Sequence, residues 1–506
     1  MNRRASTVRA LVEALPGARL LGSGDSCVGR VVYDSRLVQP GDLFAALRGA
    51  DFDGHQFVRE AEQRGAVALL VESAVPTALP QIQVDDSRAA LAAIAAEHFD
   101  HPSSHLGVIG ITGTDGKTTT SYVVDHILRF AGARTGMVGT VAIRVGERED
   151  LHPSRQTTPE SSDVQWYLRQ MVDAEVSWAI LEATSHGLAM HRLDHVHFDI
   201  AAVTNITHEH LDYHGTVENY QRAKATLLER VAAESGVVVA NADDAGSRAI
   251  EHFAMGAKVI RYSANGFDAD LRARGVRSTR SGSTFVLDAG AYGSAKCTLP
   301  LIGEFNVANT LCAAGIALAA GVDLDAIAAA LATAPPVPGR MARIEAGQPF
   351  SVVVDYAHTP DAIEKVLTLL RRLHPSGRVI AVFGSAGERD VEKRPLQGAI
   401  AARLADVSVI TSEDPRFEDA DAIIAQIAAG AEAEGAVAGN SLFCRSDRRD
   451  AIQLALDLAR PGDCVLLAGK GHEGSIIWGG DKLPWDEAAV ARELLRNGRF
   501  SEPGDC

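Results

Sequence analysis

A glycine-rich loop between a predicted strand and a predicted helix constrains the fold of this chain more than any other feature. Residues 106–111 are apolar, which predicts a buried strand, and a helical pattern begins at Thr118. The loop between them consists of Gly113, Thr114, Asp115, Gly116, Lys117, Thr118 and Thr119. In such a unit the backbone N–H groups of the loop and the N-terminus of the helix point at a bound phosphate. We expect Lys117 to add charge at the terminal phosphates and the Thr118 hydroxyl to bind Mg²⁺.

The loop is shorter than a strict Walker A loop. That pattern has a glycine five positions before the glycine of its Gly-Lys pair, and here the position is Ile111. The alternative is a glycine turn that only caps a helix and leaves Lys117 in solvent. The preceding apolar strand and the two threonines that follow favour phosphate binding, so the loop predicts an ATP-dependent enzyme.

The amino-acid composition limits the classes of protein to which this chain can belong. The 506 residues are 46% hydrophobic and 23% charged, which is typical of a soluble globular protein with about three domains. A net charge of −16 excludes a general nucleic-acid binder, and the absence of a long uncharged apolar run predicts no membrane span. Six cysteines without CxxC spacing fit a reducing compartment, so we expect a cytoplasmic protein, and a monomer. They are Cys27, Cys297, Cys312, Cys444, Cys464 and Cys506.

Two breaks in the pattern divide the chain into expected domains over residues 1–104, 105–337 and 338–506. The first break lies at residues 101–105, after a helical pattern at 87–99, and the second at 335–339, where prolines end a helix. In the last domain, strand patterns at 351–355, 378–383, 407–411 and 464–468 alternate with helical patterns at 360–372, 393–405, 420–433 and 447–459. This alternation predicts the α/β class with mostly parallel sheets, in which ligands bind beyond the carboxyl ends of the strands.

Histidines gather in one stretch of the middle domain. They are His186, His191, His195, His197, His208, His210 and His214. A zinc site is one interpretation, but no HExxH motif occurs and no cysteine lies nearby, so we expect one or two of them at most to be metal ligands. Glu182 ends an apolar strand, which places its carboxylate at the edge of the sheet as an Mg²⁺ ligand. The alternative is an acid that caps the helix after Thr184.

Lys224 lies on the apolar face of a predicted helix over residues 218–229, together with Tyr220, Ala223, Leu227 and Leu228. An unpaired ammonium is costly there, although a lysine can also extend to the edge of an apolar face. The helical pattern by itself favours the second interpretation.

The glycine loop resembles that of the Mur ligase and folylpolyglutamate synthase superfamily, whose members join carboxylates to amines through acyl phosphates. Folate enzymes typically have Gly-Ser after the lysine, whereas this chain has Thr118 and Thr119, as in the muramyl-peptide branch. Further motifs match the branch that adds the third peptide residue, in order along essentially the whole chain. They lie at residues 33–36, 40–44, 157–159, 182–188, 205–215, 303–309, 338–341, 355–360 and 389–395. The resemblance implies a small α/β domain that binds a UDP-sugar, a central P-loop ATPase domain with a parallel sheet, and a C-terminal Rossmann-like domain.

The resemblance also implies three substrate sites. ATP would be bound by the seven loop residues with Asn309, Arg340, Asp355 and His358. The UDP-N-acetylmuramoyl dipeptide would be bound by Ser35, Thr157, Thr158, Thr184 and Arg192. The incoming amino acid would be bound by Arg389, Asp414, Arg416, Gly469 and Glu473. Because the ATP residues come from two domains, we expect domain closure during the reaction.

For catalysis, the resemblance implies that Lys117, Lys393 and two Mg²⁺ ions neutralise charge on the transferring phosphoryl group. In the family, the lysine at position 224 carries a carbamate derived from CO₂, which helps to hold the second Mg²⁺ with the counterparts of His210 and Glu182. The expected metal ligands are thus Thr118, Glu182, His210 and carbamylated Lys224. A carbamate would also relieve the cost of burying this lysine, since it replaces a cation by a metal-bound anion.

Three positions depart from the branch. Asp115 replaces the usual asparagine, Met190 replaces a glutamine that touches substrate, and Ala342 replaces a glutamate. None of these changes removes a catalytic group, but Met190 alters one expected substrate contact.

The identity of the added amino acid depends on Asp414 and Arg416. Arg416 offers a bidentate site for a distal carboxylate, which only diaminopimelate supplies among the usual diamino acids. Asp414 stands where diaminopimelate-adding enzymes usually have asparagine, and its charge would favour the distal ammonium of ornithine or lysine. The alternative for Arg416 is a surface ion pair in an acidic loop. We expect diaminopimelate, with ornithine or lysine as the alternative substrate. The alternatives to this function are another acid–amine ligase of the superfamily, a catalytically inactive nucleotide-binding protein and, more remotely, a zinc hydrolase.

Overall fold

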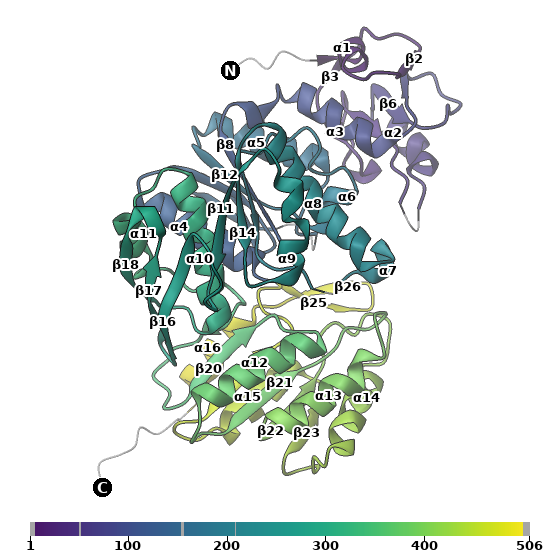
Figure 1. Cartoon of the computed structure of the whole chain (residues 1–506). Coiled ribbons are helices and arrows are strands. Elements are labelled where there is room, and N and C mark those ends of the chain that lie inside the picture. The colour runs from purple at the N-terminus through teal and green to yellow at the C-terminus, as the bar shows by residue number, and fades with distance from the viewer. Residues whose placement is uncertain (1–5, 50–51, 153–155, 208, 499–506) are drawn as a thin grey trace. The chain divides into compact units, whose positions relative to one another are not determined.

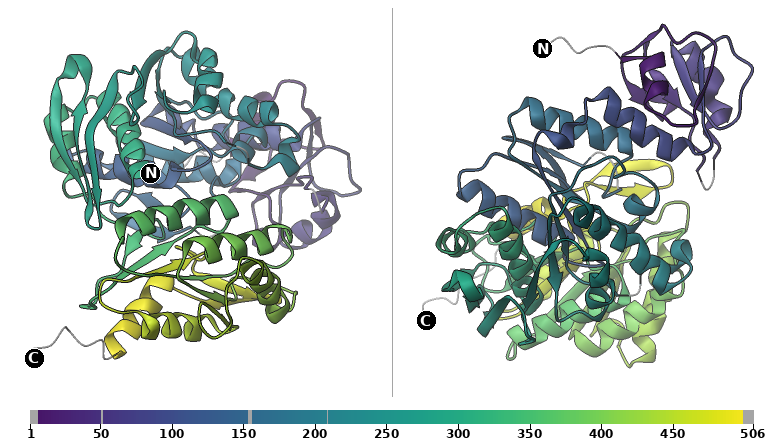
Figure 2. Two further views of the ribbon diagram at one scale, coloured as in Figure 1. Left: turned by 60° about the horizontal axis from the view of Figure 1, so that its bottom comes forward. Right: turned by 45° about the horizontal axis from the view of Figure 1, so that its top comes forward.

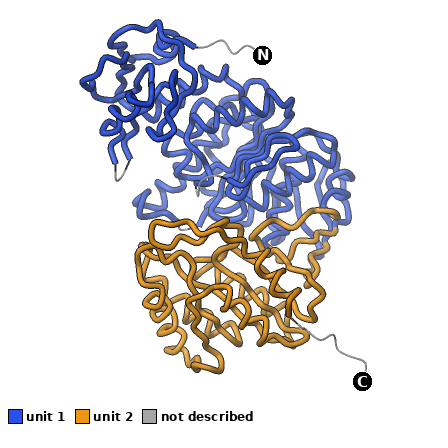
Figure 3. The backbone as a smooth tube through the Cα atoms, turned by 180° about the vertical axis from the view of Figure 1, so that it is seen from behind, with its two compact units in different colours: residues 1–275, 285–297, 305–331 blue, residues 276–284, 298–304, 332–506 orange. Residues whose placement is uncertain are grey.

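The computed structural model describes residues 6–49, 52–152, 156–207 and 209–498. Contacts divide the chain into two compact units (Figure 3). Unit 1 comprises the chain up to residue 275 with residues 285–297 and 305–331, and unit 2 comprises residues 276–284, 298–304 and the chain from 332 onward. The domain boundaries expected from the sequence stay predictions.

Unit 1 begins with a five-stranded sheet. Its order is β2 (Arg19–Leu21), β7 (Gln81–Gln83), β6 (Ala68–Val71), β5 (Leu43–Ala45) and β4 (Val31–Val32). Alternate residues of the strands face opposite ways, so that Leu43 packs with α1 (Val8–Glu13) and α3 (Ser87–His98), and Phe44 packs with α2 (Val58–Gln63). The central strands β5 and β6 are buried on both faces between these helices, which explains why they are apolar.

Most of an eleven-stranded sheet lies in the rest of unit 1 (Figures 1 and 2), whereas residues 276–279, 282–284 and 298–299 of its last three strands belong to unit 2. Its order is β11 (Arg148–Leu151), β10 (Ala142–Val145), β9 (Thr135–Val138), β12 (Trp178–Glu182), β8 (Gly107–Thr112), β13 (Ile200–Val203), β14 (Val237–Asn241), β15 (Lys258–Ser263), β16 (Leu271–Thr279), β17 (Gly282–Asp288) and β18 (Ser294–Leu299). Strands β9, β12, β8, β13, β14 and β15 are parallel, so their carboxyl ends meet at one edge. The phosphate loop follows β8 at this edge.

Helices cover both faces of that sheet. Val108 and Leu181 belong to one core with α5 (Ser161–Asp173) and α8 (Val217–Ala233), whereas α4 (Lys117–Phe130) contacts β8, β9 and β12 and packs beside α11 (Leu324–Leu331). The remaining helices of the unit are α6 (Ser185–Ala189), α7 (Leu211–His214), α9 (Ala245–Ile250) and α10 (Glu304–Ala319). Helix α4 begins at Lys117, one residue before the predicted start.

Unit 2 contains a six-stranded sheet of order β19 (Ala342–Arg343), β20 (Ser351–Asp355), β24 (Cys464–Ala468), β21 (Val379–Phe383), β22 (Val407–Thr411) and β23 (Leu442–Arg445). All pairs except β19–β20 are parallel. Helices α12 (Pro360–Leu373), α13 (Lys393–Leu404) and α14 (Ala420–Ala433) cover one face, and α15 (Arg448–Leu458) and α16 (Glu487–Asn497) cover the other. A hairpin of β25 (Ser475–Trp478) and β26 (Asp481–Pro484) precedes α16.

The predicted α/β class is confirmed, and the predicted strands at 351–355, 407–411 and 464–468 match β20, β22 and β24 residue for residue. The predicted apolar face of the Lys224 helix is buried at Tyr220, Lys224, Leu227 and Leu228 and half-buried at Ala223, and Ala225 is buried as well. None of the helices in the described part of the chain is long and apolar enough to cross a membrane.

Candidate active site

The phosphate loop is held against the end of β13. Thr114 N donates to Asn205 O over 2.7 Å, and Asp115 N donates to Asn205 Oδ1 over 2.9 Å. The loop needs glycine at two places: a Cβ on Gly113 (φ 153°) would lie 1.8 Å from Thr204 Oγ1, and one on Gly116 (φ 83°) would lie 2.3 Å from Asn309 Oδ1. The structure therefore brings Asn309, which the resemblance assigned to the ATP site, directly against the loop.

Lys117 is folded back over this loop. Its Nζ donates to Gly113 O over 2.8 Å and to Thr114 O over 2.9 Å. Because of these two contacts, the ammonium is half-buried rather than extended into solvent. From this position it can move to a phosphate that enters the loop.

Thr118, in the first turn of helix α4, contacts Glu182 at the end of strand β12. The Thr118 hydroxyl donates to Glu182 Oε2 over 3.0 Å, and Thr140 binds both oxygens of the same carboxylate, through its N at 3.0 Å and its Oγ1 at 2.8 Å. Thr118 and Glu182 are 4% and 1% exposed. Thr157 joins the group through its hydroxyl, 3.0 Å from Thr140 Oγ1. Hydroxyl and carboxylate oxygens at one buried place form the kind of donor set that Mg²⁺ prefers.

Lys224 lies under the other side of the loop. Its side chain is 1% exposed, its Nζ donates to Gly113 O over 2.7 Å, and the ammonium lies 4.6 Å from the ring centre of Tyr220. No carboxylate of the described residues forms an ion pair with it. Burial is the main cause that lowers the pKa of Lys224 well below its ordinary value, and the charge of Lys117 lowers it further.

The histidines do not assemble into one site. The ring of His186 makes a T-shaped contact with that of His210 at 4.6 Å and a tilted contact with that of His214 at 5.5 Å. By contrast, His191 pairs with Asp194 at 2.7 Å, His197 lies 3.6 Å from Asp199, and burial lowers the pKa of His195. His208 lies outside the described residues. Within the described ranges, no group of three or more histidine, cysteine or acidic side chains could hold a metal ion, so the zinc interpretation gains no support. Nor is there a hydrogen bond or ion pair among Lys224, His210 and Glu182, all three of which are described.

Three residues expected to bind the dipeptide, Thr158, Thr184 and Arg192, are connected through Thr158. Thr158 Oγ1 donates to Glu182 O over 2.8 Å and lies 2.9 Å from Thr184 Oγ1. Arg192, which is 7% exposed, donates to Thr158 O over 3.0 Å and forms an ion pair with Glu160 at 3.0 Å. Met190 Sδ lies 3.5 Å from Arg192 Nη2, so the thioether contacts the guanidinium directly. Ser35 is separate from these residues, since its hydroxyl donates to Glu60 over 2.7 Å.

Glu160 was not predicted from the sequence. Its carboxylate lies between Arg192 and Arg88, whose Nη1 is 2.8 Å away. Its place immediately after the Thr-Thr-Pro motif could have indicated a role in this site. Its two arginine partners lie 72 and 32 residues away along the chain, so the sequence alone could not pair them with it.

In unit 2, Asp355 is buried at the carboxyl end of β20. Its two oxygens accept the backbone N–H groups of Met341 and Ala357, both at 2.8 Å, and burial raises its pKa. Arg340 lies 4.8 Å from the ring centre of Tyr356. Lys393, the first residue of α13, donates to His358 O over 3.2 Å, and burial lowers its pKa.

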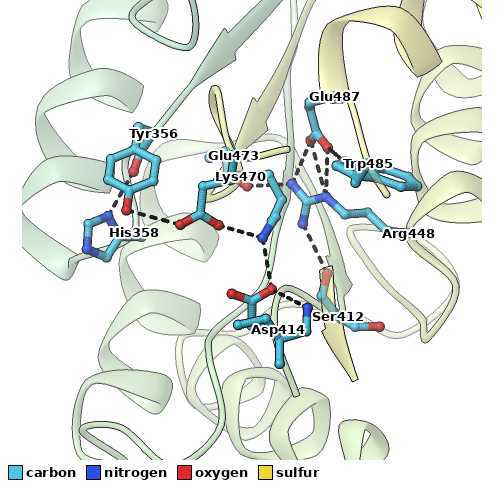
Figure 4. A network of polar contacts seen from close by, with 11 residues as sticks. Tyr356, His358, Ser412, Asp414, Arg448, Lys470, Glu473, Trp485 and Glu487 are labelled. Atoms are coloured by element: carbon cyan, nitrogen blue, oxygen red, sulfur yellow. Dashed lines mark hydrogen bonds and ion pairs between the residues drawn. The ribbon is translucent and has the colours of Figure 1, made fainter. Parts of the chain in front are cut away.

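The expected amino-acid site contains a buried lysine between two acids (Figure 4). Lys470 Nζ lies 2.9 Å from Asp414 Oδ1 and 2.5 Å from Glu473 Oε2. Arg416 is partly buried with φ 54°, whereas Arg389 is exposed. Gly469 has φ 101° and faces Glu413, which a Cβ would approach to 3.0 Å. Asp414 and Glu473, the two partners of Lys470, were predicted from the sequence, whereas Lys470 itself was not.

Three family models match the chain in order. They are described as Mur ligase family, catalytic domain, over residues 28–99, as Mur ligase middle domain over residues 111–317, and as Mur ligase, glutamate ligase domain, over residues 339–471. A relative from Roseiflexus sp. (strain RS-1), named UDP-N-acetylmuramyl-tripeptide synthetase, is 50% identical over 92% of this chain and 94% of its own length. The chain belongs to the Mur ligase family. Its members are ligases that form amide bonds at the expense of ATP, and the enzyme class predicted from the sequence is confirmed.

Other Mur ligases resemble the whole chain. UDP-N-acetylmuramoyl-L-alanyl-D-glutamate--2,6-diaminopimelate ligase of Geobacillus kaustophilus (strain HTA426) is 40% identical over 96% of this chain and 98% of its own. A solved structure of a protein with the same name has a TM-score of 0.67 and 30% identity, and covers 97% of this chain and 99% of that one. A MurF structure from Acinetobacter baumannii, 22% identical over 97% of this chain and 98% of its own, has a TM-score of 0.68 and shares the fold.

Proposed function

We propose that this Mur ligase adds a diamino acid, preferentially meso-diaminopimelate, to UDP-N-acetylmuramoyl-L-alanyl-D-glutamate and converts ATP to ADP. The observation that carries the proposal is the phosphate loop, in which the Thr118 hydroxyl is bonded to the buried carboxylate of Glu182. Full-length similarity to a tripeptide synthetase and to diaminopimelate ligases supports the choice of substrates.

The reaction has two steps. An oxygen of the free carboxylate of the dipeptide forms a bond to the γ-phosphorus of ATP, and the bond from that phosphorus to its bridging oxygen breaks, which releases ADP. The amine then attacks the acyl carbon, phosphate leaves, and the nitrogen loses a proton. Lys117 and Lys393 stabilise the charge on the transferring group. When bound at Thr118 and Glu182, Mg²⁺ supplies further positive charge there.

Lys224 is proposed to react with CO₂, and His210 to serve with Glu182 and the carbamate at a second Mg²⁺. The amine nitrogen forms a bond to the carbon of CO₂ and releases a proton, which leaves a carbamate anion. The burial of Lys224 and its lowered pKa support this step, because only the neutral amine is a nucleophile. The single hydrogen bond to Gly113 O also leaves Nζ with less compensation than a buried ammonium requires.

The remaining assignments are part of the same proposal. Residues 1–104 bind the UDP-sugar through Ser35, residues 105–337 bind ATP, and residues 338–506 bind the incoming amino acid and contribute Arg340, Asp355 and His358 to the ATP site. Thr157, Thr158, Thr184 and Arg192 bind the dipeptide. We propose a cytoplasmic monomer, in keeping with the unpaired cysteines among the described residues.

The test is ADP release by the purified protein. We expect release that requires both the UDP-muramoyl dipeptide and a diamino acid, with diaminopimelate faster than ornithine or lysine when the three are assayed side by side. No release with any of the three would refute the ligase and favour an inactive nucleotide-binding protein. Faster reaction with ornithine or lysine would leave the ligase in place and replace diaminopimelate.

A further inference from the structure

Lys470 follows β24 and points into the group expected to read the incoming amino acid (Figure 4). Its side chain is 0% exposed, and its ammonium is shared by Asp414 Oδ1 at 2.9 Å and Glu473 Oε2 at 2.5 Å. A buried ammonium with two carboxylate partners is compensated, and so are the two acids, which would otherwise repel each other. Both acids had been assigned to substrate from the resemblance alone.

We propose that Lys470 is a positioning residue that sets the specificity for the added amino acid. This inference rests on the proposed function. Lys470 occupies a place that the distal ammonium of ornithine or lysine would otherwise take between Asp414 and Glu473, and it holds both carboxylates in fixed positions.

The charge of the group supports this role. Asp414 and Glu473 carry two negative charges, and Lys470 reduces the sum to one. Arg416 adds a positive group two residues from Asp414. The distal end of diaminopimelate carries an ammonium and a carboxylate, which match the one residual negative charge and the guanidinium of Arg416. The distal end of ornithine or lysine carries an ammonium alone and would leave Arg416 without an anion. Without the ammonium of Lys470, the group would be more negative by one charge, so it would attract a cationic side chain of the substrate more strongly and repel a distal carboxylate.

Backbone contacts also link the position of Asp414 to that of Arg416. The same Asp414 Oδ1 accepts the backbone N–H of Ile477 over 2.9 Å. Ile477 O in turn accepts the N–H of Arg416 over 3.1 Å, and Arg416 O accepts the N–H of Gly479 over 2.7 Å. Asp414 and Arg416 are therefore tied to the same strand, β25. On the other side, Tyr356 donates to Glu473 Oε1 over 3.3 Å. Loss of Lys470 would release Asp414 and, through Ile477, the backbone that positions Arg416.

The experiment compares Lys470→Met with Asp414→Asn, because the two changes alter the charge of the group in opposite directions. For each variant, kcat and KM are measured with diaminopimelate, ornithine and lysine. In Lys470→Met we expect the ratio of kcat/KM for diaminopimelate to that for ornithine to fall by about tenfold or more. In Asp414→Asn the remaining charges favour a distal carboxylate, so we expect the ratio to rise. We expect the KM values for ATP and for the UDP-dipeptide to stay within about twofold in both, since neither Lys470 nor Asp414 is among the residues proposed to bind these two substrates.

The matched control is Lys482→Met on the exposed strand β26, which we expect to leave all ratios unchanged. Wild-type protein that is inactive with all three amino acids would refute the proposed function itself. Active wild type with ratios that do not move, or that move in the same direction in both variants, would overturn the role of Lys470 alone. A parallel rise of all three KM values in Lys470→Met would indicate a structural role and would also overturn it. If Lys470→Met does not fold, as judged by circular dichroism, an unchanged or lowered ratio in Asp414→Asn decides against the proposal.

Discussion

Lys224 donates a hydrogen bond to the carbonyl of Gly113 over 2.7 Å, which ties helix α8 to the first residue of the phosphate loop. Lys117 donates to the same carbonyl over 2.8 Å. Two ammonium groups thus converge on one carbonyl oxygen, and the charge of Lys117 contributes to the lowered pKa of Lys224. Conversion of Lys224 to an anion would turn this repulsion into attraction.

We expect Lys224→Ala to lose nearly all ADP release and to regain part of it when short carboxylate anions are added, because an anion can enter the space of the missing carbamate. Lys258→Ala, at an exposed position at the start of β15, is the control. Activity of Lys224→Ala equal to wild type without additives would remove the carbamate from the mechanism.

For Glu182→Gln we expect at least about a hundredfold loss of kcat in a folded protein, since the change removes the charge that faces Thr118 and Thr140. Saturation with Mg²⁺ should require higher concentrations than in wild type. The measurement is ADP release against Mg²⁺ concentration, with the exposed Glu234→Gln as the control. An Mg²⁺ dependence identical to that of wild type would exclude Glu182 as a ligand.

The strands of unit 2 could be predicted from the sequence because they are buried on both faces and read as continuous apolar runs. The phosphate loop was predictable for a related reason: its glycines, lysine and threonines are contiguous, so one local pattern contains both the structure and the chemistry. Lys224 was predictable in part, since helical periodicity placed it on the buried face, but its contact with Gly113 crosses 111 residues of chain.

Side-chain pairs between distant segments could not be predicted. Asp414 was interpreted as a free charge for a substrate ammonium, whereas the structure pairs it with Lys470, 56 residues later. The sequence gives the charge of each residue but not the neighbour that compensates it, and that neighbour decides what the charge can bind.

Glu160 is predicted to position Arg192 rather than to touch the reacting atoms. In Glu160→Gln the guanidiniums of Arg88 and Arg192 lose their shared carboxylate, so we expect the KM for the UDP-dipeptide to rise about fivefold or more while the KM for ATP is unchanged. Steady-state kinetics with each substrate varied would measure this. Glu147→Gln, in an ion pair whose acid is 79% exposed, should change neither KM. Equal effects on both KM values would contradict the positioning role.

His191 is predicted to make a pH-dependent contribution to the free energy of unfolding. Its hydrogen bond with Asp194 raises its pKa above the ordinary value of 6.5, so the folded state binds the proton more tightly than the unfolded state. The stabilisation is complete below 6.5 and is lost as the pH rises through the raised pKa. We therefore expect the difference in unfolding free energy between wild type and His191→Gln to be larger at about pH 6 than at about pH 8.5. Because the imidazole is 39% exposed, solvent screening keeps the effect small. Urea unfolding at the two pH values would measure it, and a larger difference at the higher pH would contradict it.

Arg416→Lys tests the proposed contact with the distal carboxylate. A lysine keeps the positive charge but cannot form two parallel hydrogen bonds, so we expect kcat/KM for diaminopimelate to fall by about 10-fold to 100-fold. Ornithine has no distal carboxylate, and its kcat/KM should change by less than about twofold, which makes it the internal control. The exposed Arg389 lies in the same expected site, and Arg389→Lys shows whether any charged group there has the same effect. Equal losses with diaminopimelate and ornithine would show that Arg416 supports the fold of the site without reading the carboxylate.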